Sequence, residues 1–202
     1  MLVCHLIIFA RFPRLGTVKT RLAADIGAVA ALGFQRTLFA GTLYRVGRDR
    51  RWRTVLAITP DRSRPWPRGW VHFGQGPGDL GQRMARAMRM QPPGPVVIVG
   101  CDIPALRRHH IAAAFRALGD HDVVFGPATD GGYWLVGVRR RPRFCDPFRM
   151  VRWSSPHALA DTVANLAGKR FVFMETLDDV DDGPAFFRYR RHSQEMRGCG
   201  GG

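Results

Sequence analysis

A basic loop near the N-terminus has the residue types and spacing of a phosphate-binding segment. It runs from Ala10 to Leu22, between an apolar run and a helix-compatible stretch. Backbone N–H groups at the start of a helix, together with Lys19 and Arg21, can cradle phosphate oxygens. Cations at a helix N-terminus oppose the helix dipole by roughly a few tenths of a kcal/mol, which favours an anionic ligand over a merely solvated loop. We therefore predict a nucleotide-binding loop whose contacts include Arg11, Gly16, Lys19 and Arg21.

An aspartate follows a second apolar run, in Gly100-Cys101-Asp102-Ile103-Pro104 after Val96–Val99. Glycine before Asp102 and proline after it would hold the carboxylate rigidly where the strand ends. Mg²⁺ takes one or two such oxygen ligands from protein and completes its shell with phosphate and water. A cap for the helix expected near Arg107 is the alternative, but Asp102 lies several residues too early for that role. We predict that Asp102 binds a metal and that Gly100 lies against the nucleotide.

The segment Asp130-Gly131-Gly132 precedes an aromatic run that begins at Tyr133. Two consecutive glycines permit a ligand to approach the backbone closely, although they also simply make a turn. We include Asp130, Gly131 and Gly132 among the candidate nucleotide contacts.

Four carboxylates lie within five positions, from Asp178 to Asp182, in an otherwise basic chain. Such a cluster is self-repelling unless a cation or arginines neutralise it. Asp182 is placed to cap a helix that begins at Pro184. Asp179 and Asp181 are therefore the candidate metal ligands of this cluster.

Short apolar runs that alternate with helix-compatible stretches must position these residues, and they predict an α/β fold. The runs Leu6–Phe9 and Val96–Val99 are continuously apolar, as strands buried on both faces of a parallel sheet are. Ligands of such sheets bind outside the carboxyl ends of the strands. The expected strands are Leu2–Phe9, Thr54–Ile58, Val71–Phe73, Pro95–Val99, Val123–Phe125, Tyr133–Val138 and Phe171–Met174. The expected helices are Thr20–Val46, Leu80–Met90, Arg107–Leu118, Pro156–Ala167 and Pro184–Arg191.

Length and composition fit one ordinary domain, which we place at residues 1–192, with a disordered Gly-rich tail at 193–202. The chain has 202 residues, 46% of them hydrophobic, 4 cysteines without metal-like spacing, and a formal net charge of +15. No apolar run is long enough to span a bilayer, and we expect a cytoplasmic protein with reduced thiols. The positive charge is carried mainly by scattered arginines, which favours a solvated surface over a nucleic-acid groove.

Five segments together resemble the DUF2064 family, from Leu2 to about Phe186. They are the loop with Pro13, Gly16 and Lys19-Thr20-Arg21-Leu22, the segment Gly78 to Met84, Gly100-x-Asp102-x-Pro104, Asp130-Gly131-Gly132-Tyr133, and Asp179-Val180-Asp181. That family belongs to the A-type glycosyltransferase superfamily of nucleotide-diphospho-sugar transferases, and some members are named arsenosugar-biosynthesis glycosyltransferases. Its relatives include phospholactate guanylyltransferases and molybdenum-cofactor nucleotidyltransferases.

The resemblance implies a Rossmann-like three-layer sandwich with a mostly parallel sheet, the A-type glycosyltransferase fold. It also implies Asp102 and Asp181 as ligands of Mg²⁺ or Mn²⁺, and it places Asp79 among the nucleotide-binding residues. One departure is Gln82, where the family usually carries glutamate.

Both lines of reasoning predict a metal-dependent transferase that acts on a nucleotide-activated donor, with Lys19, Arg21 and Asp102 in catalysis. Lys19 and Arg21 would offset charge on the phosphates, which is electrostatic rather than covalent catalysis. We favour a glycosyltransferase that uses a nucleotide-diphospho-sugar and an unknown small-molecule acceptor.

Two other functions stay open. A nucleotidyltransferase could use the same site, with a phosphorylated acceptor attacking the α-phosphorus and pyrophosphate leaving. A nucleic-acid-binding module is suggested by the charge and by Trp52, Trp66 and Trp70 among arginines, since aromatic rings between basic residues can stack on single strands. The acidic cluster and Asp102 have no role in that second alternative.

Overall fold

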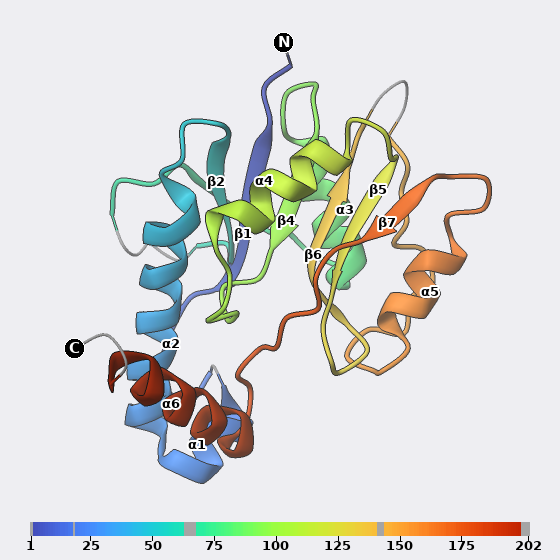
Figure 1. Cartoon of the computed structure of the whole chain (residues 1–202). Helices are drawn as coiled ribbons and strands as arrows, with labels where there is room; N and C mark the ends of the chain where they lie inside the picture. The colour runs from blue at the N-terminus through green and yellow to red at the C-terminus, as the bar shows by residue number, and fades with distance from the viewer. Residues whose placement is uncertain (1, 18, 63–67, 141–143, 199–202) are drawn as a thin grey trace.

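A seven-stranded sheet forms the centre of the computed structural model, which describes residues 2–17, 19–62, 68–140 and 144–198 (Figure 1). Its strands lie in the order β3-β2-β1-β4-β6-β5-β7. Strand β6 runs antiparallel to β4 and β5, and the other neighbouring strands are parallel. The strands are β1 His5–Arg11, β2 Arg53–Thr59, β3 His72–Gly74, β4 Val96–Val99, β5 Val123–Pro127, β6 Tyr133–Val138 and β7 Phe171–Phe173. All seven expected strands are present, and the predicted mostly parallel α/β sheet is confirmed.

Helices cover both faces of the sheet, which gives the predicted three layers. Leu6 and Ile8 of β1 pack with α2 and α4 in one apolar cluster, whereas Ile7 packs with α3 in the other. This alternation arises because successive side chains of a strand point to opposite faces. The helices are α1 Thr20–Ile26, α2 Ala28–Thr42, the π-helical turn η1 Leu43–Gly47, α3 Leu80–Arg89, α4 Arg108–Ala117, α5 Ala158–Ala164 and α6 Gly183–Gly198. In the described residues, no helix is both long and apolar enough to cross a membrane.

The first long helix differs from the single helix expected over Thr20–Val46. Gly27 interrupts it with φ 87°, a left-handed backbone angle that glycine adopts without a steric penalty. The Gly27 N–H bonds the carbonyl of Ala23 at 3.0 Å and so closes the last turn of α1. The chain then changes direction into α2. The expected single helix is therefore two helices.

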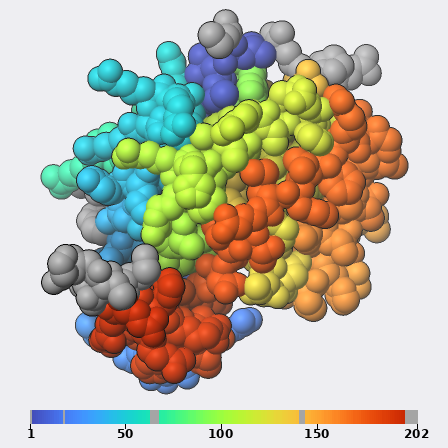
Figure 2. Space-filling model, in the orientation of Figure 1, coloured from blue at the N-terminus to red at the C-terminus, as the bar shows by residue number. Residues whose placement is uncertain are grey.

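Order also extends further at the C-terminus than expected, because α6 continues through Gly198 instead of ending near residue 192. Gln194 and Glu195 are good helix formers, so the helix continues past the apolar residues that anchor it. Phe186 packs edge-on against Phe34 at a centroid distance of 4.9 Å. Figure 2 shows this red helix lying against the blue N-terminal helices. Residues 199–202 of the expected disordered tail lie outside the described residues.

Gly137 in the central strand β6 gives the first testable prediction. A Cβ there would lie 2.7 Å from Val124 Cγ1 and 2.9 Å from Val97 Cγ2, two buried side chains that cannot easily move. We expect Gly137→Ala to lower the free energy of unfolding by about 1–3 kcal/mol, as overpacking does. Gly33→Ala is the matched control, because Gly33 is exposed on α2 with nothing within 4 Å, and it should stabilise the protein by roughly 0.5–1 kcal/mol. Urea unfolding measures both, and equal stability of the two variants would contradict this packing.

Candidate active site

The sheet brings the predicted motifs to one edge. Ile8 of β1 pairs with Val99 of β4, and Val99 pairs in turn with Leu135 of β6. Because β6 is antiparallel, its first residues lie beside the last residues of β4. The basic loop after β1, the loop after β4 and the turn before β6 therefore meet at the carboxyl edge, where ligands of α/β sheets bind.

Lys19 joins two carboxylates from distant segments at this edge. Its Nζ donates hydrogen bonds to Asp102 Oδ2 and to Asp181 Oδ1, each at 3.1 Å. The Lys19 side chain is only 4% exposed, so the ammonium depends on these two carboxylates for its stabilisation. Burial alone would lower the pKa of Lys19, but the two carboxylates raise it above its ordinary value. Lys19 is therefore charged, and it fixes both predicted metal ligands in one place.

Lys19 also has an unusual backbone. It precedes α1 with φ 51° and ψ 49°, and its carbonyl accepts the N–H of Ala23 at 2.8 Å. The left-handed conformation costs a non-glycine residue roughly 1–2 kcal/mol. The ion pairs with Asp102 and Asp181 offset this cost and fix the position of the Lys19 side chain.

The acidic cluster divides into structural and site-facing members. Asp182 Oδ1 accepts the N–H of Ala185 at 2.8 Å, which confirms Asp182 as the cap of α6. Asp178 accepts a hydrogen bond from the Thr129 hydroxyl at 2.6 Å. Asp179 and Asp181 instead line a cavity at the sheet edge.

The environment of Asp179 shows how negative this edge is. Burial, and after it the carboxylates of Asp102, Asp130 and Asp181, together raise the pKa of Asp179 to about 6, although the Lys19 ammonium lowers it. One ammonium thus does not balance the nearby carboxylates. A divalent cation would suit this excess of oxygen donors.

Two neighbouring cavities lie over the edge. The larger, of about 660 Å³, has walls that include Arg11, Lys19 and Gly100. The smaller, of about 490 Å³, has walls that include Asp130, Gly132, Asp179 and Trp153. Both contain a shared set of residues, among them Arg21, Leu80, Asp102, Tyr133, Ser154 and Asp181. The volumes are within the usual range of small-molecule sites.

Two site residues were missed in the sequence. Gln35 is 5% exposed and lines the larger cavity, and Trp153 lines the smaller one. Gln35 Oε1 and Trp153 Nε1 are buried polar atoms without a hydrogen-bond partner among the described residues. Neither residue lies in a motif, because Gln35 is in the middle of α2 and Trp153 lies in a loop far along the chain.

Cys101 lies beside Asp102 but is not a nucleophile. It is buried, and burial raises the pKa of its thiol to about 12, so it is protonated at neutral pH. The Gln35 amide donates a hydrogen bond to Cys101 Sγ at 3.4 Å. Cys101 is therefore a small buried residue of the core.

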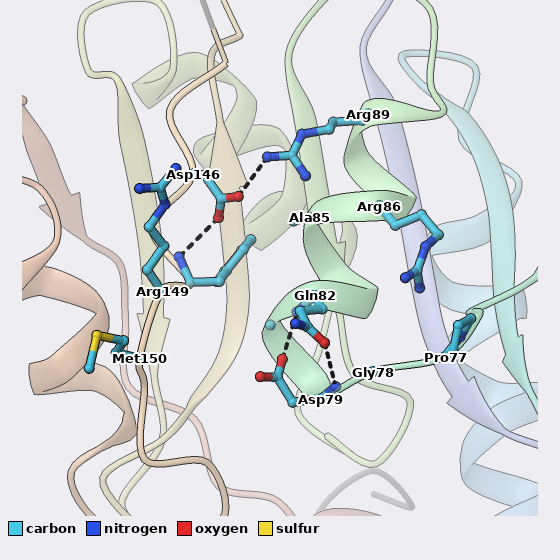
Figure 3. Close-up of a pocket in the computed structure, with 12 residues that line it drawn as sticks. Pro77, Gly78, Asp79, Gln82, Ala85, Arg86, Arg89, Asp146, Arg149 and Met150 are labelled. Carbon is cyan, nitrogen blue, oxygen red and sulfur yellow. Dashed lines mark hydrogen bonds and ion pairs between the residues drawn. The ribbon is translucent and has the colours of Figure 1, made fainter.

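Asp79 is not brought to the two cavities. It caps α3, with its carboxylate accepting the Gln82 N–H at 2.8 Å while Gln82 Oε1 accepts the Asp79 N–H at 3.1 Å (Figure 3). The pair lines a third cavity, of about 810 Å³, on the other side of the helix. This reciprocal cap explains Gln82, since glutamine and glutamate both complete a capping box.

Two of the predicted glycines have backbone roles. Gly16 has φ 73° in the basic loop and is not among the described residues that line the two cavities. Gly131 has φ 84° and lies so close to the backbone of Pro156 that a Cβ would collide with it. The Gly131 carbonyl accepts the Leu159 N–H at 3.0 Å, which ties the turn before β6 to α5.

A second group of possible metal ligands is His109, His110 and Glu175, whose donor atoms lie within 4.8 Å of one another. His110 Nδ1 accepts the N–H of Arg107 at 3.0 Å. The proton of the neutral ring is therefore on Nε2, which lies 3.2 Å from Glu175 Oε2 and donates to it. Because both ring nitrogens are already used, this group is a hydrogen-bonded link between α4 and the segment after β7.

Of the tryptophans suggested for stacking on single strands, the two in the described part of the chain, Trp52 and Trp70, are not exposed rings. Trp52 is 5% exposed, and its Nε1 donates to the Val46 carbonyl at 2.9 Å inside the core. Trp70 is half-buried against Gly47. Trp66 lies outside the described residues.

Solved structures share this architecture. A protein from Desulfovibrio desulfuricans G20, provisionally described as a nucleotide-diphospho-sugar transferase, is 28% identical with a TM-score of 0.81, over 89% of this chain and 82% of that chain. The 4-diphosphocytidyl-2C-methyl-D-erythritol synthase of Anaerococcus prevotii DSM 20548 is 9% identical with a TM-score of 0.59, over 95% and 96% of the chains. A CMP:2-keto-3-deoxy-manno-octonic acid synthetase complexed with CTP is 12% identical with a TM-score of 0.56, over 97% and 100%. The last two show a common fold.

Sequence comparison identifies the family. No curated protein matches the chain. The model of the family described as "Uncharacterized protein conserved in bacteria (DUF2064)" matches residues 42–155, which contain Asp102 and Asp130 but not Lys19 or Asp181. Because this match covers more than half of the chain, the protein belongs to the DUF2064 family.

Proposed function

We propose that this protein is a metal-dependent transferase whose donor is a nucleotide-diphospho-sugar. The observation that carries the proposal is the Lys19 ammonium held between Asp102 and Asp181 in the wall of a nucleotide-sized cavity. The similarity to the described nucleotide-diphospho-sugar transferase over 89% of this chain supports the same class of donor.

The phosphates would lie against the basic loop. Arg11 and Arg21 are both exposed and line the larger cavity, so their guanidinium groups are available to phosphate oxygens. Arg21 Nη1 lies 3.8 Å from Asp181 Oδ2, and the Arg21 side chain is 78% exposed. Arginine binds phosphate with two parallel hydrogen bonds, which orients the donor as well as attracting it.

The metal would be held by Asp102 and Asp181. The neighbouring carboxylates of Asp130 and Asp179 support this assignment, since with Asp102 and Asp181 they outnumber the single Lys19 ammonium. When bound, Mg²⁺ or Mn²⁺ would neutralise phosphate charge and stabilise the leaving diphosphate. Lys19 would keep the two carboxylates in place, because each uses one oxygen to bind its ammonium.

The smaller cavity suits a sugar and a hydroxylated acceptor. Tyr133 and Trp153 contribute aromatic surface, and Asp130 and Asp179 contribute carboxylates. Carboxylates accept hydrogen bonds from hydroxyl groups, and aromatic rings cover the apolar face of a ligand. This lining favours glycosyl transfer, in which the acceptor attacks the sugar carbon and the nucleoside diphosphate leaves.

The second candidate is nucleotidyl transfer, in which a phosphorylated acceptor attacks the α-phosphorus and pyrophosphate leaves. The concentration of Arg11, Lys19 and Arg21 around one cavity favours it, because a triphosphate carries more charge than a diphosphate. The two reactions differ in their products.

The metal assignment predicts the effect of removing either carboxylate charge. Asp102→Asn and Asp181→Asn should each abolish Mg²⁺-dependent binding of a nucleoside diphosphate, because an amide keeps the shape but loses the charge. Calorimetry with and without Mg²⁺ measures this. Asp178→Asn is the matched control and should bind as the parent does, because Asp178 bonds Thr129 outside the cavities. Parent-like Mg²⁺ dependence of both site variants would contradict the assignment.

The phosphate assignment predicts a charge-specific loss for Arg21→Ala. Removing one charge-assisted contact worth about 1.5–3 kcal/mol should weaken nucleoside diphosphate binding at least about tenfold and leave nucleoside binding unchanged. Arg14→Ala controls for the general field of the loop, because Arg14 is an exposed arginine of the same loop. Equal losses in the two variants would show that Arg21 does not contact the phosphates.

Product analysis separates the two reactions. Incubation with Mg²⁺ and a panel of nucleotide-sugars should release nucleoside diphosphate, and the release should be lost in Asp102→Asn. The same protein with nucleoside triphosphates and phosphorylated acceptors should form no pyrophosphate. Pyrophosphate formation that Asp102→Asn abolishes would instead establish nucleotidyl transfer.

A further inference from the structure

The third cavity, of about 810 Å³, lies on the side of α3 away from the active site. Its walls come from one side of α3 along its whole length, the residues just before it, and the loop 146–150 (Figure 3). The volume is within the range of small-molecule sites. Nothing in the transferase proposal uses this cavity.

The charges around this cavity do not balance. Three arginines line it (Arg86, Arg89 and Arg149), against the two carboxylates of Asp79 and Asp146. Asp146 Oδ2 accepts a hydrogen bond from Arg89 at 2.6 Å, and Asp79 is used in the cap of α3. Both carboxylates are therefore already engaged.

The other two guanidinium groups form no ion pair among the described residues. Arg86 Nη1 donates to the Gln75 carbonyl at 2.7 Å, a neutral acceptor that orients the side chain without cancelling its charge. Arg149 is exposed, and its guanidinium has no hydrogen-bond or ion-pair partner among the described residues. The Arg149 carbonyl accepts an amide N–H of Asn165 at 2.7 Å, which fixes the backbone from which the side chain extends.

The cavity also has apolar walls. Phe148 and Ala85 are buried residues that line it, and Met150 at its rim is fully exposed. A flexible, polarisable methionine side chain adapts to ligands of different shape. The cavity thus combines positive charge with apolar surface.

We propose that this cavity is a second ligand site, for a small anion that carries an apolar group. The anion, a phosphate or a carboxylate, pairs with Arg149, and the apolar group lies against Phe148 and Met150. The proposal does not rest on the transferase assignment, because the two sites have different walls.

Helix α3 lies between the two sites and contributes residues to the walls of both. Leu80 and Met84 face the larger active-site cavity, whereas Gln82 and Arg86 face this one. A Cβ on Gly81 would lie 2.6 Å from Cζ2 of the Trp153 ring and 2.8 Å from the Cβ and the carbonyl oxygen of Phe148, so residues of both sites pack against the helix backbone at Gly81. A ligand on Phe148 therefore lies one side chain away from the wall of the active site.

The test uses phenyl phosphate as the probe. Phenylacetate, the anion of phenylacetic acid, represents carboxylates, and phenol is the uncharged control. Calorimetry on the full chain should show binding of at least one anion and none of phenol. Arg149→Gln should weaken this binding about tenfold or more, since it removes a charge-assisted pair on an exposed side chain. Arg116→Gln, an exposed arginine on α4, and Arg21→Ala in the active site should leave it unchanged.

Three results would overturn the proposal. Absence of binding by both anions would show that the cavity is not a site of this kind. Equal weakening by Arg149→Gln and Arg116→Gln would show nonspecific attraction to a basic protein. Loss of binding in Arg21→Ala with none in Arg149→Gln would place the probe in the active site. Preference for phosphate or for carboxylate decides which anion the site takes.

Discussion

The candidate active site depends on the ion pairs that the buried Lys19 ammonium forms with two carboxylates. The ammonium holds Asp102, from the loop after β4, and Asp181, from the segment before α6, each at 3.1 Å. Removing one partner of a buried ion pair leaves an uncompensated charge, which costs more than the pair itself contributes. The three segments therefore assemble together, and the left-handed backbone of Lys19 is tolerated because the assembled site holds it there.

The reversed strand β6 decides what else reaches this edge. Between β4 and β5 it runs against both neighbours, so the turn with Asp130 and Gly132 lies beside the Asp102 loop rather than at the opposite end of the sheet. Small residues make this central position possible, since Gly137 fits between Val124 and Val97 where a Cβ would not. The same strand contributes Tyr133 and Trp134 to the cavity walls.

Helix α3 has a comparable role between two cavities. Its polar cap, formed by Asp79 and Gln82, fixes the start of the helix and lines the third cavity rather than the one that contains Lys19. Its apolar residues Leu80 and Met84 line the cavity that contains Lys19. One short amphipathic helix thus separates the cavities beside Lys19, Asp102 and Asp181 from a cavity lined by three arginines.

The seven strands, the mostly parallel α/β sheet and the cap at Asp182 could all be predicted from the amino-acid sequence, because strand periodicity and capping are local patterns. The end of an apolar strand singled out Asp102, and the family resemblance paired it with Asp181. The partners of Lys19 came only from the tertiary structure, because they lie 83 and 162 residues away and the order of the strands brings them together. Gln35 and Trp153 lie at the site for the same reason, whereas the Asp79 carboxylate turns back to cap α3 and does not line the two cavities. Local patterns specify elements, whereas which side chains meet depends on how the elements pack.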